Sequence, residues 1–197
     1  KHIAWFISPH GRGHAARAAA IMVALRTRSE DFVFEVYTLV DETFFDESVG
    51  RGFDFHAVET DLGLVQDTPL EENVPATILR LDEQLPYDDR LVTSLAAEIN
   101  AADCVAVVCD IAPLGICVAR EAGVPSILVE NFRWDWIYEG YLDAHPGIGQ
   151  AIEYMREIFK LADFHIQTAP ISEPVKCDFT SGAVSRKPVH TRQETRA

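Results

Sequence analysis

A glycine loop near the start of the chain carries residues that could do acid–base chemistry. The stretch "ISPHGRGHAARAAA" (7–20) contains Gly11-x-Gly13-x-x-Ala16, which matches the G-x-G-x-x-G/A fingerprint of dinucleotide-binding loops. A loop that only cradles a pyrophosphate needs no histidine at the entrance of its helix. An imidazole titrates near neutral pH and can take a proton from a hydroxyl. We therefore interpret His14 as a candidate general base.

The same loop is suited to an anion, because the backbone N–H groups and the dipole at a helix start favour negative charge. His14 and Arg17 are three residues apart and share a helix face, so both could meet one ligand. A surface salt bridge is the alternative for Arg17, and a solvated side chain is the alternative for Arg12. The residues of the loop predicted to bind substrate are His10, Gly11, Arg12, Gly13 and Arg17.

Asp110 is the candidate partner of His14. A catalytic histidine usually needs a carboxylate to orient it, and Asp110 ends the apolar run "CVAVVCD". We expect the two side chains to lie within hydrogen-bond reach, about 2.6–3.2 Å, directly or through one water. The alternative for Asp110 is a cap of the helix that follows, which carries Pro113 in its first turn.

Polar and aromatic candidates follow the next apolar run. Glu130 and Asn131 end "PSILVEN" and are predicted to bind substrate. Aromatic faces stack well on sugars, so we expect Trp134 and Asp135 to line the binding cleft, with packing in a core as the alternative. Trp136 is expected in the core.

These candidates meet only if the intervening elements bring them together. The expected strands are 2–8, 32–40, 53–59, 104–110, 125–131 and 162–168, and the expected helices are 14–28, 91–99, 112–123 and 148–159. A long loop is expected between the third strand and the second helix, over 60–76. The alternation predicts an α/β fold, a Rossmann-like parallel sheet with helices on both faces. Such sheets bind ligands at the carboxyl ends of their strands, where all the candidates lie.

Composition argues against several kinds of partner. The net charge of −14 argues against nucleic acid, whose binders cluster lysine and arginine. The four cysteines form no C-x-x-C pair and no zinc-ligand spacing. Flexible glycines separate His10 from His14, and no third ligand is in view, so we expect no metal. No apolar run approaches the roughly 20 residues of a membrane span, and we expect a cytoplasmic protein.

Two segments carry a resemblance to known proteins. The segment "GRGHAAR" resembles the Gly-His-x-x-Arg loop of GT-B glycosyltransferases, which include UDP-sugar transferases and the murein-precursor N-acetylglucosaminyltransferase. The segment "CDIAPLGICVAREAGVPSILVENFRWDWIYEGY" resembles a branch of glycosyltransferase-like proteins with an NF-x-WD-x-IY segment, which includes the amino-terminal half of plant-type arabinose kinases. The likeness covers the whole chain and corresponds to the first of two Rossmann-like domains.

The resemblance implies a domain organisation. Residues 1–185 would form the acceptor-side domain, and residues 186–197 would begin the linker to a second, donor-binding domain that is absent from this sequence. The capping box Thr191-x-x-Glu194, a helix start with no helix body after it, agrees with that expectation.

The resemblance also implies a reaction. It would be an inverting, metal-independent transfer from a nucleotide-sugar, a UDP-sugar, to a small-molecule acceptor, without a cofactor. His14 would be the base and Asp110 its orienting partner, and the isolated fragment would be inactive. Two alternatives stay open: an NAD(P)-linked oxidoreductase, with Asp41 near the end of the second strand, and a non-catalytic sugar-binding or regulatory module.

Overall fold

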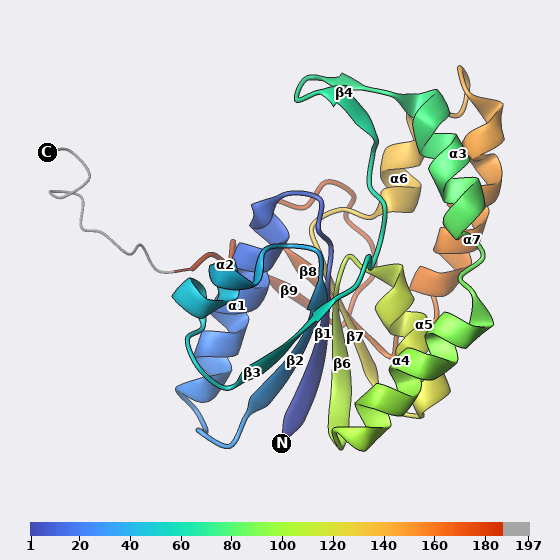
Figure 1. Cartoon of the computed structure of the whole chain (residues 1–197). Coiled ribbons are helices and arrows are strands. Elements are labelled where there is room, and N and C mark those ends of the chain that lie inside the picture. The colour runs from blue at the N-terminus through green and yellow to red at the C-terminus, as the bar shows by residue number, and fades with distance from the viewer. Residues whose placement is uncertain (187–197) are drawn as a thin grey trace, which may run out of the picture.

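A seven-stranded sheet forms the centre of the computed structural model, which describes residues 1–186 (Figure 1). All of its strand pairings are parallel. In spatial order its strands are β3 (Phe53–Ala57), β2 (Val33–Thr38), β1 (His2–Ile7), β6 (Cys104–Asp110), β7 (Ser126–Glu130), β8 (Phe164–Thr168) and β9 (Phe179–Ser181). The predicted Rossmann-like α/β architecture is confirmed. The predicted helix start at Thr191 and nearly all of the predicted linker lie outside the described residues.

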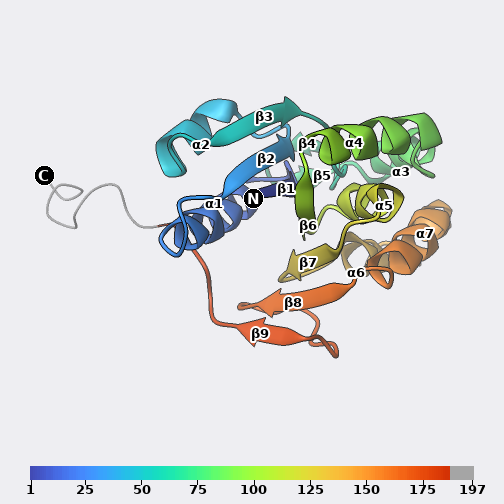
Figure 2. The ribbon, with the colours of Figure 1, turned by 90° about the horizontal axis from the view of Figure 1, so that it is seen from below.

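Helices cover both faces of the sheet, as predicted (Figure 2). One face carries α1 (Arg12–Arg26) and α2 (Glu42–Ser48), and the other carries α4 (Asp89–Ala101), α5 (Pro113–Ala122) and α7 (Gly149–Phe159). A separate apolar core fills each interface. Three fully buried alanines, Ala15, Ala18 and Ala19, present almost no side chain to β1. The first helix therefore packs closely on the strand that precedes it, which fixes the loop between them.

The order of the strands reverses at β1. The chain runs outward from β1 to β2 and β3 and then returns to the other side of β1 as β6. At such a reversal the connections leave in opposite directions and open a crevice at the carboxyl ends of the two central strands. The loop after β1 and the last residue of β6, Asp110, flank this crevice.

The expectation of a loop between 60 and 76 was wrong, and no strand was expected after 168. The first stretch contains the hairpin β4–β5 and the start of a helix, and the second contains β9. Pro75 indicates a loop by composition, but proline is favoured in the first turn of a helix, and the side chain of Asn73 caps that turn by accepting from the Ala76 N–H at 2.9 Å. The elements that were not predicted are α2, β4 (Gln66–Thr68), β5 (Glu71–Glu72), α3 (Val74–Gln84), α6 (Trp134–Glu139), the short 3₁₀ turn Pro146–Ile148, and β9.

Candidate active site

His14 and Asp110 are in direct contact across the crevice between β1 and β6. His14 lies in the first turn of α1, and its Nδ1 atom is 2.9 Å from Oδ1 of Asp110. Asp110 is fully buried, and His14 is 8% exposed. The predicted contact is confirmed. The capping alternative for Asp110 is wrong, because α5 has Ala112 at its N-cap and no side chain caps it.

Arg17, one turn further along α1, holds the same carboxylate from the other side. Its Nε atom donates to Oδ2 of Asp110 at 2.8 Å, and its Nη2 atom donates to Oδ1 at 2.5 Å. Its Nη1 atom donates to Oδ1 of Asn131 at 2.8 Å and to Oγ1 of Thr168 at 3.0 Å. One guanidinium thus ties together the ends of β6, β7 and β8. Arg17 is 6% exposed with these donors engaged, so it supports the site from inside. An ion pair, one of the two alternatives for Arg17, is present, but it is buried and does not lie at the surface.

The pair of charges keeps Asp110 ionised. Burial by itself raises the pKa of a carboxyl group, but the hydrogen bonds and positive charges of Arg17 and His14 outweigh burial and hold the pKa of Asp110 below its ordinary value. The site therefore contains a carboxylate at neutral pH.

The carboxylate also selects the tautomer of His14. Nδ1 of His14 is closer to Asp110, at 2.9 Å, than to Nη2 of Arg17, at 3.3 Å. We assign the proton of the neutral ring to Nδ1, which donates to Asp110, since an unprotonated Nδ1 would set two acceptors against each other at the shorter contact. Nε2 then carries a lone pair and can accept a proton.

The backbone on both sides of the crevice is specialised. Gly11 is the N-cap of α1 with φ 88°, a backbone conformation that residues other than glycine rarely adopt. Ile111, directly after Asp110, has φ 49° although it is β-branched and fully buried. Such a backbone costs on the order of 1–3 kcal/mol and occurs mainly at functional sites. Here it turns the chain sharply at the point where Asp110 must face α1.

The start of α1 is left open to a ligand. No side chain caps this helix, and no acidic residue lies in its first turn. Gly13 is exposed, and a Cβ atom added there would meet nothing within 4 Å. Arg12 is exposed beside it. The free N–H groups of the first turn are therefore accessible to an anion.

A hollow of about 280 Å³ opens beside this cluster. It is lined by Gly13, His14, Arg17, Asn131, Phe132, Thr168, Ala169, Pro170, Ala183 and Val184. Because Oδ1 of Asn131 accepts from Arg17, the amide NH₂ group is the part of Asn131 that remains for a ligand. Thr168 is a contributor that the sequence analysis missed; it ends an ordinary strand and carries no motif.

The other predicted substrate residues are buried. Glu130 is 2% exposed and accepts hydrogen bonds from His165 and Gln167, both at 2.8 Å. Trp134 is 2% exposed and Asp135 1%, so neither lines the cleft with an exposed surface, whereas Trp136 is half-buried. Packing had been the alternative for this segment, and it describes Trp134 better than the cleft does.

Trp134 leads to a further buried carboxyl group, Asp61, which the sequence analysis also missed. Its indole Nε1–H donates to Asp61 at 2.9 Å, and the hydroxyl of Ser8 donates to the same carboxyl at 3.0 Å. Asp61 lies in an irregular acidic stretch, where an acid is unremarkable in the sequence. Its burial arises only from tertiary packing. His10 lies against Trp134 edge-on, and burial, followed by the nearby His14, lowers the pKa of His10.

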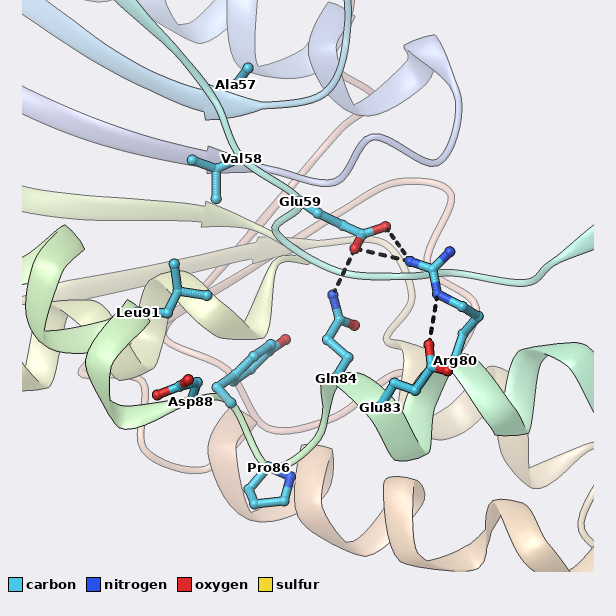
Figure 3. A pocket seen from close by; sticks show the side chains of 10 residues that line it. Ala57, Val58, Glu59, Arg80, Glu83, Gln84, Pro86, Asp88 and Leu91 are labelled. Carbon is cyan, nitrogen blue, oxygen red and sulfur yellow. Dashed lines mark hydrogen bonds and ion pairs between the residues drawn. The ribbon is translucent and has the colours of Figure 1, made fainter.

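A larger hollow of about 510 Å³ lies at the carboxyl end of β3 (Figure 3). Within it Arg80 bonds to both oxygens of Glu59 at 3.2 Å and lies 3.8 Å from Glu83, and Gln84 also donates to Glu59. These two carboxylates offset the charge of Arg80, whose side chain is 49% exposed. The hollow therefore does not offer Arg80 as a free cation to a phosphate.

The described residues contain no group of three or more histidine, cysteine, aspartate or glutamate side chains placed to hold a metal ion. No helix in that part of the chain has the length and apolar character needed to cross a membrane. Asp41, the candidate ribose ligand of the oxidoreductase alternative, is exposed and caps α2 through the N–H and hydroxyl of Thr43.

The fold and the crevice define the class: the chain has the Rossmann-like architecture of GT-B glycosyltransferases. A UDP-glucosyltransferase from Polygonum tinctorium superposes with a TM-score of 0.56, over 99% of this chain and 55% of that one, at 17% identity. Spinosyn forosaminyltransferase gives 0.53 over 91% and 50%, at 16% identity. MurG from Acinetobacter baumannii gives 0.50 over 98% and 47%, at 13% identity. The chain thus spans about half the length of these enzymes, and the likeness establishes the fold.

Sequence comparison adds one relative. L-arabinokinase from Arabidopsis thaliana is 29% identical over 154 residues, which are 73% of this chain and 14% of that protein. No family model matches the chain.

Proposed function

We propose that this chain is the acceptor-binding half of an inverting, metal-independent glycosyltransferase that uses a nucleotide-sugar, a UDP-sugar, as donor. The observation that carries the proposal is His14, whose Nδ1 atom is held by a buried carboxylate while its Nε2 atom is left to accept a proton. This arrangement lines a hollow at the point of the sheet where ligands bind. The GT-B fold supports the reaction class.

In the proposed reaction the acceptor hydroxyl donates its proton to Nε2 of His14. The acceptor oxygen forms a bond to the anomeric carbon of the donor sugar from the face opposite the leaving group. The bond from that carbon to the diphosphate oxygen breaks, and the diphosphate leaves with the electron pair. Asp110 holds the ring through its Nδ1–H and stabilises the imidazolium that forms.

The start of α1 supports the metal-independent part of the proposal. A leaving diphosphate gains negative charge, and exposed N–H groups at a helix start stabilise such charge without a cation. The room above Gly13 allows a phosphate to approach the backbone. We propose that no cofactor takes part.

The test uses the full-length protein, which under this proposal includes a donor-binding second domain. Transfer and hydrolysis of a panel of UDP-sugars would be measured for the wild type, for His14→Gln and for His56→Gln. The His56 side chain, on β3, is the matched control, because it is likewise bonded to a carboxylate, Glu35, at 2.9 Å. His14→Gln should lower turnover on the order of 10²–10⁴-fold with donor affinity nearly unchanged. Equal activity of the two variants would show that His14 is not the base.

A second candidate function is a non-catalytic sugar-binding module. The similarity to L-arabinokinase, of which the chain covers only a small part, favours this candidate. Calorimetry of the isolated chain with L-arabinose distinguishes the two. Saturable binding, together with a full-length protein that transfers no sugar, would favour the module.

A further inference from the structure

Asp61 lies outside the His14–Asp110–Arg17 cluster but directly beneath the loop that leads to it. The side chain is fully buried. It accepts one hydrogen bond from Ser8, the residue after β1, and one from Trp134, the first residue of α6. The carboxyl group therefore joins the loop after β1 to α6.

The segment that carries Asp61 is fastened on both sides. The hydroxyl of Thr60 donates to the carbonyl of Ile7 at 2.8 Å, and the hydroxyl of Tyr138 donates to the carbonyl of Gly63 at 2.7 Å. His10 packs so closely on Gly63 that a Cβ atom there would lie 2.5 Å from its ring. A movement of Asp61 is therefore passed to the loop and is not absorbed by the segment.

Aromatic contacts lead from this carboxyl group to the base. The ring of Trp134 meets His10 edge-on, with centroids 5.0 Å apart, and Phe132 at 5.3 Å. Phe132, which lines the small hollow, meets His14 edge-on at 5.6 Å. Ser8 provides the second route, since its hydroxyl oxygen accepts from the backbone N–H of His10 at 3.4 Å.

We propose that Asp61 is a positioning residue of this site, and that gain or loss of its proton changes the seating of the loop after β1 and of Trp134 against His14. When ionised, Asp61 accepts from both Ser8 and Trp134. When protonated, it must itself donate, so the Ser8 hydroxyl turns to accept and its hydrogen bond to the carboxyl group reverses. The change reaches His10 through Ser8 and reaches His14 through the aromatic rings.

The surroundings of Asp61 allow both forms near neutral pH. Burial raises the pKa of Asp61 to about 7, against the lowering effect of the hydrogen bonds from Trp134 and Ser8. The charged groups that act on it are His14 on α1, which lowers the pKa, and Asp110 at the end of β6, which raises it. The ionisable phenols that face it, Tyr87 and Tyr138, have pKa values raised by burial and stay neutral.

The test is an NMR titration of the 197-residue chain from pH 5 to 9. It follows the indole N–H of Trp134, assigned with Trp134→Phe, and the backbone N–H of His10. Both resonances should move with one midpoint near pH 7. Asp61→Asn keeps the size and mimics the protonated form, and it should abolish the shared transition. His10→Gln and His14→Gln should retain it at the indole.

A transition that persists in Asp61→Asn and disappears in a histidine variant would overturn the proposal, and so would an indole that titrates while the His10 amide stays still. Ser8→Ala gives a second reading should Asp61→Asn not fold. It removes the hydrogen bond from Ser8 to the ionised form, which is stronger than the reversed bond of the protonated form, so the midpoint should rise, and an unchanged midpoint would count against the proposal. The inference rests on the proposed function in one respect, which is that His14 acts as the base of a transferase. The titration needs no sugar transfer, so its failure and the failure of the transferase assay are separate results.

Discussion

Both carboxylate oxygens of Asp110 accept hydrogen bonds from Arg17. The carboxylate that orients His14 is therefore already compensated by a buried cation. In a dyad of histidine and aspartate alone, the carboxylate supplies both orientation and a counter-charge. In this site Arg17 already balances a large part of the negative charge of Asp110. The main contribution of Asp110 to His14 is therefore to orient the imidazole ring.

Loss of Arg17 should destabilise the fold strongly. Arg17→Met leaves a buried, unpaired carboxylate, and breaking a buried pair in this way typically costs about 3–5 kcal/mol. Urea unfolding should show that loss, whereas Arg80→Met, at a partly exposed ion pair, should cost about 0–1 kcal/mol. The double variant Arg17→Met with Asp110→Asn should lose less than the sum of the single variants, and a simple sum would show that the two side chains are not coupled.

Asp110 should make the fold sensitive to acid. Its pKa is lower in the folded chain than in the unfolded chain, so its stabilising effect is present above about pH 4 and is lost as the pH falls through the folded value. The difference in melting temperature between the wild type and Asp110→Asn should therefore shrink on acidification. Exposed Asp143, changed to asparagine, is the control. A difference that stays constant from pH 6 to pH 2.5 would contradict the ionised carboxylate.

Asp61 should have the opposite effect. Its pKa is raised to about 7 in the folded chain, so the stability linked to it is complete below about pH 4 and is lost as the pH rises to about 7. Asp61→Asn cannot ionise, and its melting temperature relative to the wild type should rise over that range and then level off. A flat difference between pH 4 and pH 8 would show that Asp61 titrates normally.

Two glycines near the loop should respond differently to alanine. Gly13→Ala meets open space without a positive φ and should raise stability by up to about 1 kcal/mol, since alanine favours a helix. In the full-length enzyme it should still raise the KM for the donor, because a phosphate approaches there in the proposed reaction. Gly63→Ala should destabilise the chain, because φ is +66° and the new atom meets His10. Urea unfolding checks both, and a destabilised Gly13→Ala would refute the open approach.

NAD should not bind the isolated chain. Pro9 and His10 separate β1 from the first glycine of the loop, and Asp41 is used as a helix cap. Calorimetry with NAD should show no saturable micromolar binding beyond that of unrelated nucleotides. Saturable binding would instead favour the oxidoreductase alternative.

The sequence predicted the long elements and the central contact. Apolar runs and the alanine-rich helix locate β1, α1 and β6, and the rule that parallel strands end at one edge brings His14 to Asp110. The same reasoning could not recognise α2 and β9, which are too short for a periodic signal, or the helix that starts around Pro75. It also placed Trp134 in the cleft, because composition does not show which side of a ring is covered. Nothing in the sequence indicated that Asp61 is buried, since only the packing of its loop in the folded chain removes the side chain from water.

The partners of Arg17 have a consequence for how the chain folds. They lie 93, 114 and 151 residues away along the sequence. Each contact closes a long loop, and such non-local contacts form slowly because chain entropy is lost before they are made. In a nascent or partly unfolded chain, His14 and Asp110 therefore stay apart until β6 has paired with β1, and the contacts of Arg17 with Asn131 and Thr168 wait for β7 and β8. The proposed base is therefore oriented late in folding, and an intermediate without β6 lacks the carboxylate that orients it.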